Sequence, residues 1–382
     1  MKAPVTLVLA ALLLSACTTT LPTSEAPLDV SAPLSGSALL GEPVDPAALP
    51  DMDLLSLTPE IRELLAGVAP GRSPHARLAA LIRAFDERSL HVNYEADATL
   101  TAAQTFHQQR GNCLAFTLMM VAMARELGAD AYFNEVDVPP VWDSDDDQTF
   151  VVYRHINMVS ESRRGRRVVD FNMEAYDPLY DQRRLDDREA FAQFYSNRGV
   201  ELMQVGQMEN AFLHLRKALD LKPGSADLWA NLGALYSRAG HRAEAESSYR
   251  QALALNSGHL VAISNLERLY RAGGRTQLAE TYAARARYHR ARNPYYLYQQ
   301  AREAYEVGQY EDAKKQLKKA LRQYQDDHRF HFLMGLTNLR LGDTDSSKDS
   351  LRTAFALTKT DGARAAYLRK LQFLKEESLA AH

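Results

Sequence analysis

The stretch R-G-N-C-L-A-F-T-L-M-M-V-A-M-A-R-E-L-G-A-D-A, residues 110–131, decides the fold of the first half of the chain. Its apolar run predicts a helix over residues 114–127, and Gly128 is well placed to end that helix. Cys113 stands at the beginning of this helix, a position that favours the thiolate, which is the reactive form of cysteine. The stretch therefore predicts an apolar helix that presents a thiol at its first turn.

The segments on either side of this helix predict a mixed domain. Upstream, Thr58-Pro59-Glu60 is typical of a helix start, with a helix to about residue 68, and residues 75–89 have apolar side chains at helical spacing. Downstream, residues 131–138, 150–161 and 166–173 are rich in Val, Tyr, Phe and Ile, and Ser162 to Gly165 predicts a hairpin turn between the last two. Helices followed by antiparallel strands predict an α+β domain over about residues 51–190.

Two residues on the predicted hairpin complete a candidate site with Cys113. His155 and Asp170 lie on strands expected to be neighbours, so the carboxylate can accept a proton from one ring nitrogen while the other faces the thiol. Each residue alone has an ordinary alternative, as a buried cysteine, a core histidine or a turn acid. Their order and spacing favour a nucleophile, a general base and an orienting acid.

Residues 99–173 resemble the core of the transglutaminase-like superfamily, which shares its cysteine-histidine-aspartate logic with papain-like proteases. The resemblance rests on the 110–131 stretch together with R-H-I-N-M-V at 154–159 and R-R-V-V-D-F-N at 166–172. It implies Cys113 as nucleophile, His155 as general base and Asp170 as orienting acid. Leu114 stands where animal transglutaminases often have tryptophan, so the chain is closer to the bacterial branch, which includes many predicted peptidases and amidases.

An oxyanion donor is expected in addition to the backbone N–H of Cys113. The candidates are polar residues just upstream of the cysteine: Gln104, His107, Gln108 and Gln109. Gln104 is the preferred one.

The second half of the chain repeats with a period of 34 residues. Three positions of the period carry mostly small residues, which two helices need to cross closely: Gly199, Gly233, Glu267, Ala301 and Gly335; Ala211, Ala245, Ala279, Ala313 and Ser347; Ala218, Ala252, Ala286, Ala320 and Ala354. The pattern resembles the tetratricopeptide repeat, in five units over about residues 192–361, with a capping helix and tail over 362–382.

The resemblance implies an all-α solenoid that binds a protein or peptide partner. In the fourth unit, Tyr295, Tyr298 and Tyr305 either point into the concave groove, where they could grip a peptide, or pack between helices.

The N-terminus predicts export and lipidation. Val5 to Leu14 form an apolar run too short to span a membrane, so residues 1–16 are predicted to be a signal peptide. L-S-A-C at 14–17 resembles a lipobox, which implies that Cys17 carries lipid, and Thr18 favours the outer membrane, facing the periplasm. Residues 17–50 are rich in proline and lack Lys and Arg, which predicts a flexible tether. With two cysteines in the chain, Cys113 is then the remaining thiol.

Composition narrows the partner classes. The net charge of -3 over 382 residues gives no large positive field for nucleic acid, so no nucleic-acid partner is expected. The acidic run Asp143 to Asp147 lacks the glycine and the final glutamate of an EF-hand, because Gln148 and Arg154 stand there. No phosphate loop or zinc-spaced cluster is present, and neither a metal nor a cofactor is expected.

These observations favour a membrane-anchored thiol acyl-transfer enzyme. The expected reaction is hydrolysis of an amide, as in a peptidase or amidase, through an acyl-enzyme on Cys113, with the substrate recruited by the repeats. Two alternatives stay open: a non-catalytic lipoprotein scaffold for envelope assembly, which binds peptides through both domains, and an amine-transferring transglutaminase.

Overall fold

The computed structural model describes residues 28–87, 90–136, 155–163, 165–171, 182–358, 367–369 and 371–372. The predicted signal peptide, the lipidation site Cys17 and the acidic run Asp143 to Asp147 lie outside these residues. Among the described helices, none has both the length and the apolar character needed to cross a membrane.

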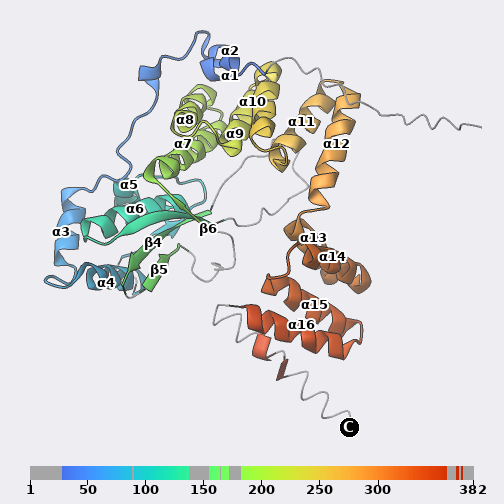
Figure 1. Cartoon of the computed structure of the whole chain (residues 1–382). Coiled ribbons are helices and arrows are strands. Elements are labelled where there is room, and N and C mark those ends of the chain that lie inside the picture. The colour runs from blue at the N-terminus through green and yellow to red at the C-terminus, as the bar shows by residue number, and fades with distance from the viewer. Residues whose placement is uncertain are drawn as a thin grey trace, which may run out of the picture.

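A four-stranded antiparallel sheet forms the centre of the N-terminal region (Figure 1). Its strands are β3 (Ala131–Val136), β4 (His155–Ser162), β5 (Gly165–Val169) and β6 (Gln182–Leu185), in the order β5-β4-β3-β6. The β4–β5 hairpin pairs Ser162 with Gly165, as the turn at 162–165 predicts. Strand β6 was not predicted, because its sequence Q-R-R-L exposes two arginines and buries only Leu185.

Helix α6 (Cys113–Glu126) packs against this sheet and begins at the cysteine, as predicted. Every residue from Leu114 to Ala124 is buried, because strands cover one face and helices α3 (Pro59–Gly67) and α5 (Ala102–Gln108) contact the other side. Helix α4 (Pro74–Asp86) also forms where apolar spacing predicts it. A short parallel pair, β1 (Asn93–Tyr94) with β2 (Arg110–Gly111), holds the segment that precedes α6.

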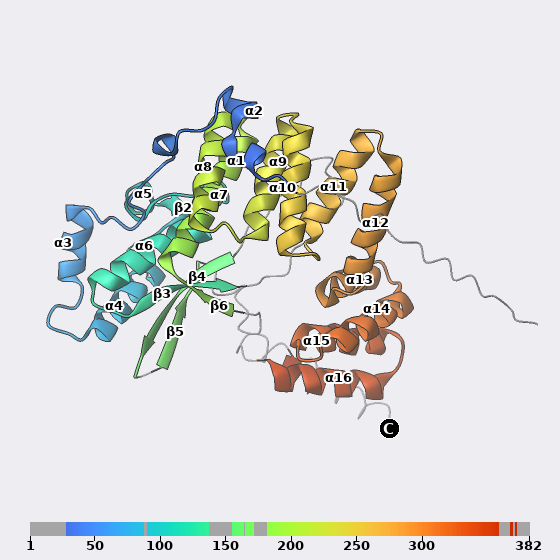
Figure 2. The same ribbon diagram turned by 45° about the horizontal axis from the view of Figure 1, so that its top comes forward.

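Over residues 187–357, ten helices form five helical hairpins (Figures 1 and 2). They are α7 (Asp187–Gln204), α8 (Met208–Leu221), α9 (Ala226–Arg238), α10 (Arg242–Leu255), α11 (Leu260–Ala272), α12 (Thr276–Arg290), α13 (Pro294–Glu306), α14 (Tyr310–Gln323), α15 (His328–Arg340) and α16 (Thr344–Leu357). A Cβ at Gly199 would lie 2.7 Å from Leu215, and one at Gly233 would lie 2.6 Å from Tyr249. The small residues of the 34-residue period therefore let paired helices cross closely, as predicted.

The structure differs from the predicted tether at residues 31–48. This segment forms α1 (Ser31–Ser35), α2 (Ser37–Leu40) and the 3₁₀ helix η1 (Pro46–Ala48), and α1 and α2 lie against α10 and α8 (Figure 2). Pro33 is buried, and its carbonyl accepts a 2.7 Å hydrogen bond from the Tyr236 hydroxyl. The prediction was wrong here because Pro33 is buried and Leu34, Leu39 and Leu40 pack, partly buried, against the apolar core.

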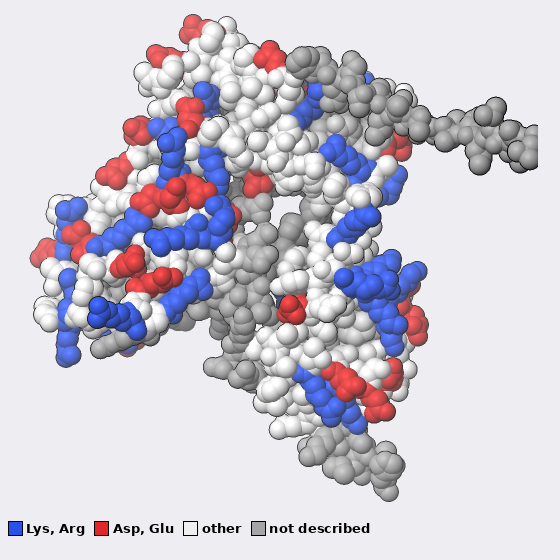
Figure 3. Space-filling view, in the orientation of Figure 1, with Lys and Arg blue, Asp and Glu red and all other residues white. Residues whose placement is uncertain are grey.

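The described part of the C-terminal segment packs on the last hairpin. Residues 367–369 and 371–372 are helical, and Tyr367 is buried with its ring stacked 4.4 Å from that of Phe332. Figure 3 shows how charge is distributed on one face: positive and negative side chains alternate over the N-terminal region, whereas positive ones gather along α12 to α14. Residues 276–323 contain ten Lys and Arg against five Asp and Glu.

Candidate functional site

The structure brings Cys113, His155 and Asp170 together. Nε2 of His155 lies 2.7 Å from Oδ2 of Asp170, and the Cys113 side chain hydrogen-bonds the same imidazole. The three residues come from the start of α6, the start of β4 and the residue that follows β5. Because Nε2 faces the carboxylate, Nδ1 is the ring nitrogen available to the thiol.

Burial differs along this set of three residues. The Asp170 side chain is fully buried, the His155 side chain is 23 % exposed, and Cys113 is half-buried. The carboxylate is thus removed from water while the thiol remains accessible. This increase in exposure from Asp170 to Cys113 suits a site in which a buried acid orients a base and the nucleophile is accessible to a substrate.

The environment of His155 favours its charged form. Burial lowers the pKa of His155, but hydrogen bonds and charge interactions with Asp170 and Cys113 outweigh this effect and raise the pKa to about 10. The imidazole is therefore protonated at neutral pH, and an imidazolium beside a thiol at a helix start stabilises the thiolate.

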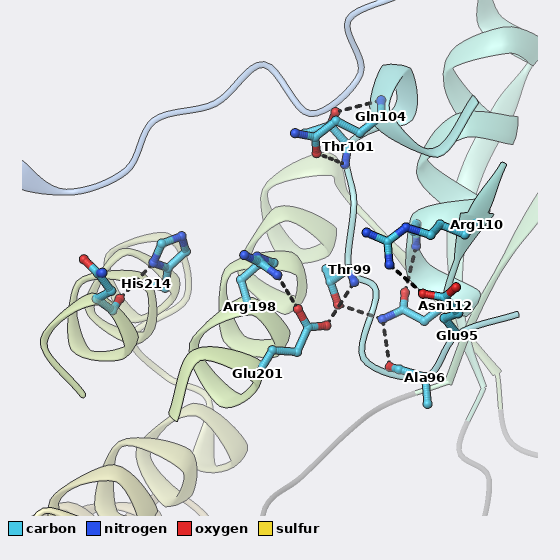
Figure 4. A network of polar contacts seen from close by, with 12 residues as sticks. Glu95, Ala96, Thr99, Thr101, Gln104, Arg110, Asn112, Arg198, Glu201 and His214 are labelled. Carbon is cyan, nitrogen blue, oxygen red and sulfur yellow. Dashed lines mark hydrogen bonds and ion pairs between the residues drawn. The ribbon is translucent and has the colours of Figure 1, made fainter. Parts of the chain in front are cut away.

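A polar network fixes the turn that carries the cysteine (Figure 4). Asn112 caps α6 by accepting a hydrogen bond from Ala115 N, and its Nδ2 donates to Oγ1 of Thr99 at 2.6 Å. The backbone N–H of Thr99 donates in turn to Glu201 of α7 at 2.9 Å. The first helix of the repeats is thereby hydrogen-bonded to the segment that positions the nucleophile.

Gln104 occupies a different place from the one expected of an oxyanion donor. It is exposed at the start of α5, and its Oε1 accepts a hydrogen bond from Thr101 N in a capping box (Figure 4). The described structure gives it no contact with Cys113. Its oxyanion role therefore stays a prediction, without support from the hydrogen bonds that Gln104 makes.

Two residues near Cys113 were not singled out from the sequence. Tyr94 of β1 is 56 % exposed with its ring 5.4 Å from that of Phe171, and burial together with the charge on Cys113 raises the pKa of Tyr94. Asn157 lies two residues beyond His155 and donates to Oδ2 of Asp170 at 2.9 Å. Single Tyr and Asn residues in strands carry no sequence pattern that would have marked either.

A polar cavity of about 340 Å³ lies where the edge of the sheet meets the first two repeats. The residues that line it come from β3, β6, α7, α9 and the loop before α9: Glu135, Gln182, Arg183, Glu189, Ala192, Gln193, Ser196, Asn197, Lys222, Ser225, Asp227, Leu228 and Asn231. Its size is within the range of small-ligand pockets.

The predicted aromatic groove of the fourth unit is partly a packing surface. Tyr295 and Tyr298 place their rings 5.6 Å and 5.0 Å from Phe330, and the Tyr305 ring lies 5.4 Å from that of Tyr310. The packing alternative is thus observed, while the half-buried tyrosines keep part of their surface accessible. Within the described residues, no group of three or more His, Cys, Asp and Glu side chains is arranged to hold a metal ion.

Comparison with known proteins identifies the repeats. Residues 192–225 and 226–259 each match a family model of the tetratricopeptide repeat. The C-terminal half carries tetratricopeptide repeats. Such repeats generally bind protein or peptide partners. No curated protein sequence matches the chain.

Solved structures with helical repeats are similar to parts of the chain. YrrB, a TPR protein with an unusual peptide-binding site, is 18% identical over 48% of this chain and 94% of its own, with a TM-score of 0.25. PilF of Pseudomonas aeruginosa is 20% identical over 52% of this chain and 100% of its own, with a TM-score of 0.27. MamA from Desulfovibrio magneticus RS-1 is 16% identical over 45% and 96%, with a TM-score of 0.26.

Proposed function

We propose that this protein is a lipid-anchored, transglutaminase-like thiol enzyme of the bacterial envelope that hydrolyses an amide bond in a protein or peptide brought to it by its repeats. The observation that carries the proposal is the contact of Cys113 with His155, together with the 2.7 Å contact of His155 with a fully buried Asp170. A structural cysteine needs neither partner. A thiol nucleophile needs both.

The proposed reaction begins with acylation of Cys113, in which His155 donates a proton to the leaving group. The Cys113 thiolate attacks the amide carbonyl, and the backbone N–H of Cys113, which has no intrahelical partner at the first position of α6, faces the developing oxyanion. The His155 imidazolium gives its proton to the leaving amine, which departs as the C–N bond breaks. A thioester to Cys113 remains.

Hydrolysis then regenerates the site. His155, now neutral, takes a proton from water as the hydroxide adds to the thioester carbonyl, and the C–S bond breaks to release a carboxylic acid and the thiolate. Asp170 holds the imidazole orientation through both steps. An amine in place of water would give transfer instead of hydrolysis.

The recruiting role of the repeats is supported by their attachment to the site. Glu201 of α7 bonds Thr99, which bonds the cap residue Asn112 beside the cysteine. A partner held by the first repeats is therefore close in structure to the reactive end of α6. The polar cavity between the sheet edge and α7 and α9 is the candidate contact site.

The proposal is tested by intact-protein mass spectrometry of the full chain carrying Cys17→Ser, so that Cys113 is its one thiol. The protein is mixed with activated peptide esters and amides, and rapid acid quenching traps acyl-enzymes. We expect one added acyl mass on the wild-type site and none on Cys113→Ala. Equal labelling of the two proteins would contradict the proposal.

A second candidate function is a scaffold that binds peptides without turnover, and the two tetratricopeptide-repeat matches favour it. It predicts that Cys113→Ala and His155→Ala leave every cellular phenotype of the protein unchanged. The enzyme proposal predicts that both variants reproduce the phenotype of a deletion. Complementation in the native host separates the two.

A further inference from the structure

Two buried asparagines stand behind the carboxylate of Asp170. Asn157 of β4 is fully buried and its Nδ2 donates to Oδ2 of Asp170 at 2.9 Å. Asn134 of β3 is 2 % exposed and its Nδ2 donates to Oδ1 of Asn157 at 2.9 Å. The two residues are direct partners in the β3–β4 register.

The arrangement follows from strand geometry. Side chains two residues apart on a strand point to the same face, so Asn157 shares a face of β4 with His155. Residues directly opposite on antiparallel strands also share a face, which places Asn134 beside Asn157. A buried amide costs free energy unless it is hydrogen-bonded, and an apolar side chain would fill this space without that cost.

The bonds of this pair are directed toward the acid. Oδ2 of Asp170 receives one contact from His155 Nε2 and a second from Asn157 Nδ2, and hydrogen bonds to a carboxylate favour its ionised form. Asn134 also donates to Oε1 of Gln182 at 3.2 Å, which accepts a further 2.7 Å bond from the Arg166 guanidinium. The amide chain thus runs from the carboxylate to the sheet edge.

We propose that Asn157, supported by Asn134, is a positioning residue that keeps the Asp170 carboxylate ionised and aimed at His155, and through it keeps Cys113 reactive at low pH. This inference rests on the proposed thiol chemistry. Within the described parts of the chain, the titratable groups beside the pair and its carboxylate include His155 and, through the imidazole, Cys113 of α6, with Tyr94 of β1 beside the thiol. Arg166 contacts the amide chain through Gln182.

The test measures the rate at which iodoacetamide alkylates Cys113 between pH 5 and pH 9, in the full chain with Cys17→Ser. We expect Asn157→Ala to slow alkylation at pH 6 by about tenfold or more, the loss of one hydrogen bond to a charged group, and to change the rate at pH 9 little. Asn134→Ala keeps Asn157 and should give a smaller slowing of the same kind.

Asn157→Asp gives a change that a merely structural residue would not. It places a second carboxylate beside Asp170, and like charges raise the proton affinity of the pair, so the low-pH loss of reactivity should move to higher pH than in the wild type. The matched control is Asn338→Ala in α15, which removes a similarly buried asparagine far along the chain from the site. Its alkylation profile should follow the wild type.

Each outcome separates the two claims. A wild-type rate that stays high at low pH, with an Asn157→Ala profile identical to it in a folded variant, would overturn the positioning role and leave the proposed function standing. A wild-type profile that rises with pH like that of a free thiol would overturn both. If Asn157→Ala fails to fold, Asn134→Ala and Asn157→Asp carry the same comparison.

Discussion

At the scale of single residues, the central feature is His155, whose two partners, Asp170 and Cys113, favour its protonated form. A solvent-exposed histidine loses its proton near pH 6.5, whereas the contacts of His155 with Asp170 and Cys113 raise its pKa to about 10. The imidazolium therefore persists over the whole neutral range.

Replacing His155 with glutamine should make Cys113 behave as an ordinary thiol. A free thiol is largely protonated at pH 6, so alkylation of Cys113 by iodoacetamide at that pH should slow by roughly 100-fold, with a much smaller change at pH 9. Rates followed by mass spectrometry in the Cys17→Ser chain measure this effect. His241→Gln in the repeats is the control, and equal slowing at both pH values would point to a structural effect instead.

The same histidine should give a pH-dependent contribution to stability. Its folded-state pKa of about 10 lies above the ordinary 6.5, so the stabilising effect is complete below pH 6.5 and is lost as pH rises toward 10. The free energy of unfolding of the wild type should therefore exceed that of His155→Gln most at pH 6. Denaturant titrations across pH 6 to 10 measure the difference, and a constant gap would contradict the assignment.

The order of residues in the sequence predicted the group of Cys113, His155 and Asp170, but it did not predict the residues that hydrogen-bond around them. Cys113, His155 and Asp170 were predictable because each stands at a marked place, a helix start or a predicted hairpin strand. Asn157 and Glu201 were not, because their partners, Asp170 and Thr99, are fixed by strand register and by packing of α7. Gln104 was chosen by sequence proximity, whereas the backbone of α5 uses its side chain as a cap.

At the scale of elements, the close approach of Gly36 to Phe212 is one of the contacts that dock residues 31–48. Gly36 has φ +73°, and an added Cβ there would overlap the Phe212 ring, while Gly41 has φ +81° with open space around it. Both positions need the left-handed backbone that glycine adopts readily. Only Gly36 also needs the absence of a side chain.

Gly36→Ala should therefore destabilise the protein more than Gly41→Ala. Both substitutions carry the backbone penalty of about 1 kcal/mol, and overpacking against Phe212 should add about 1–3 kcal/mol at Gly36. Denaturant unfolding of the two variants measures the difference. The Gly36 variant should also expose residues 31–48 to limited proteolysis, and equal stability of the two variants would contradict the docking of α1 and α2.

The prediction of a flexible tether failed at residues 31–48 because it rested on composition alone. Proline-rich sequence without Lys or Arg indicates a chain that cannot order itself, and the inference holds when no other surface is nearby. Here Phe212 and Tyr236 of the repeats supply that surface. Whether this short apolar segment is ordered depends on contacts with residues about two hundred positions away in the chain.

At the scale of the whole molecule, a buried carboxylate joins the two halves. Glu201 is 6 % exposed, and its two oxygens accept hydrogen bonds from Thr99 N and from Arg198. Burial raises the pKa of Glu201, against the opposing hydrogen bonds of Thr99 and Arg198. The first helix of the repeats is therefore also a structural part of the N-terminal region.

Glu201→Ala should weaken this junction. It leaves the buried N–H of Thr99 without its acceptor, which should lower the free energy of unfolding by about 1–3 kcal/mol. Glu201→Gln retains an acceptor oxygen and should lose less. Glu209→Ala, on the exposed first turn of α8, is the control and should change stability by less than about 0.5 kcal/mol.

The same variants test whether the hydrogen bond between Glu201 and Thr99 affects the reactivity of Cys113. Thr99 holds Asn112, so Glu201→Ala should also slow alkylation of Cys113, while Glu209→Ala should not. Alkylation rates at pH 6 compare them directly. A destabilised Glu201→Ala protein with a wild-type alkylation rate would separate the junction from the site.

The sequence by itself determined the helix that begins at Cys113, the β4–β5 hairpin and the helical hairpins of the second half, because each is specified by local periodicity and by small residues at fixed spacing. Only the tertiary structure decided the fourth strand, the docking of residues 31–48, the amide pair behind Asp170 and the bond from Glu201 to Thr99. Those features depend on contacts between residues that are distant in the chain. A buried polar group forms its hydrogen bond with a group that tertiary packing places within bonding distance, and local sequence does not specify that group.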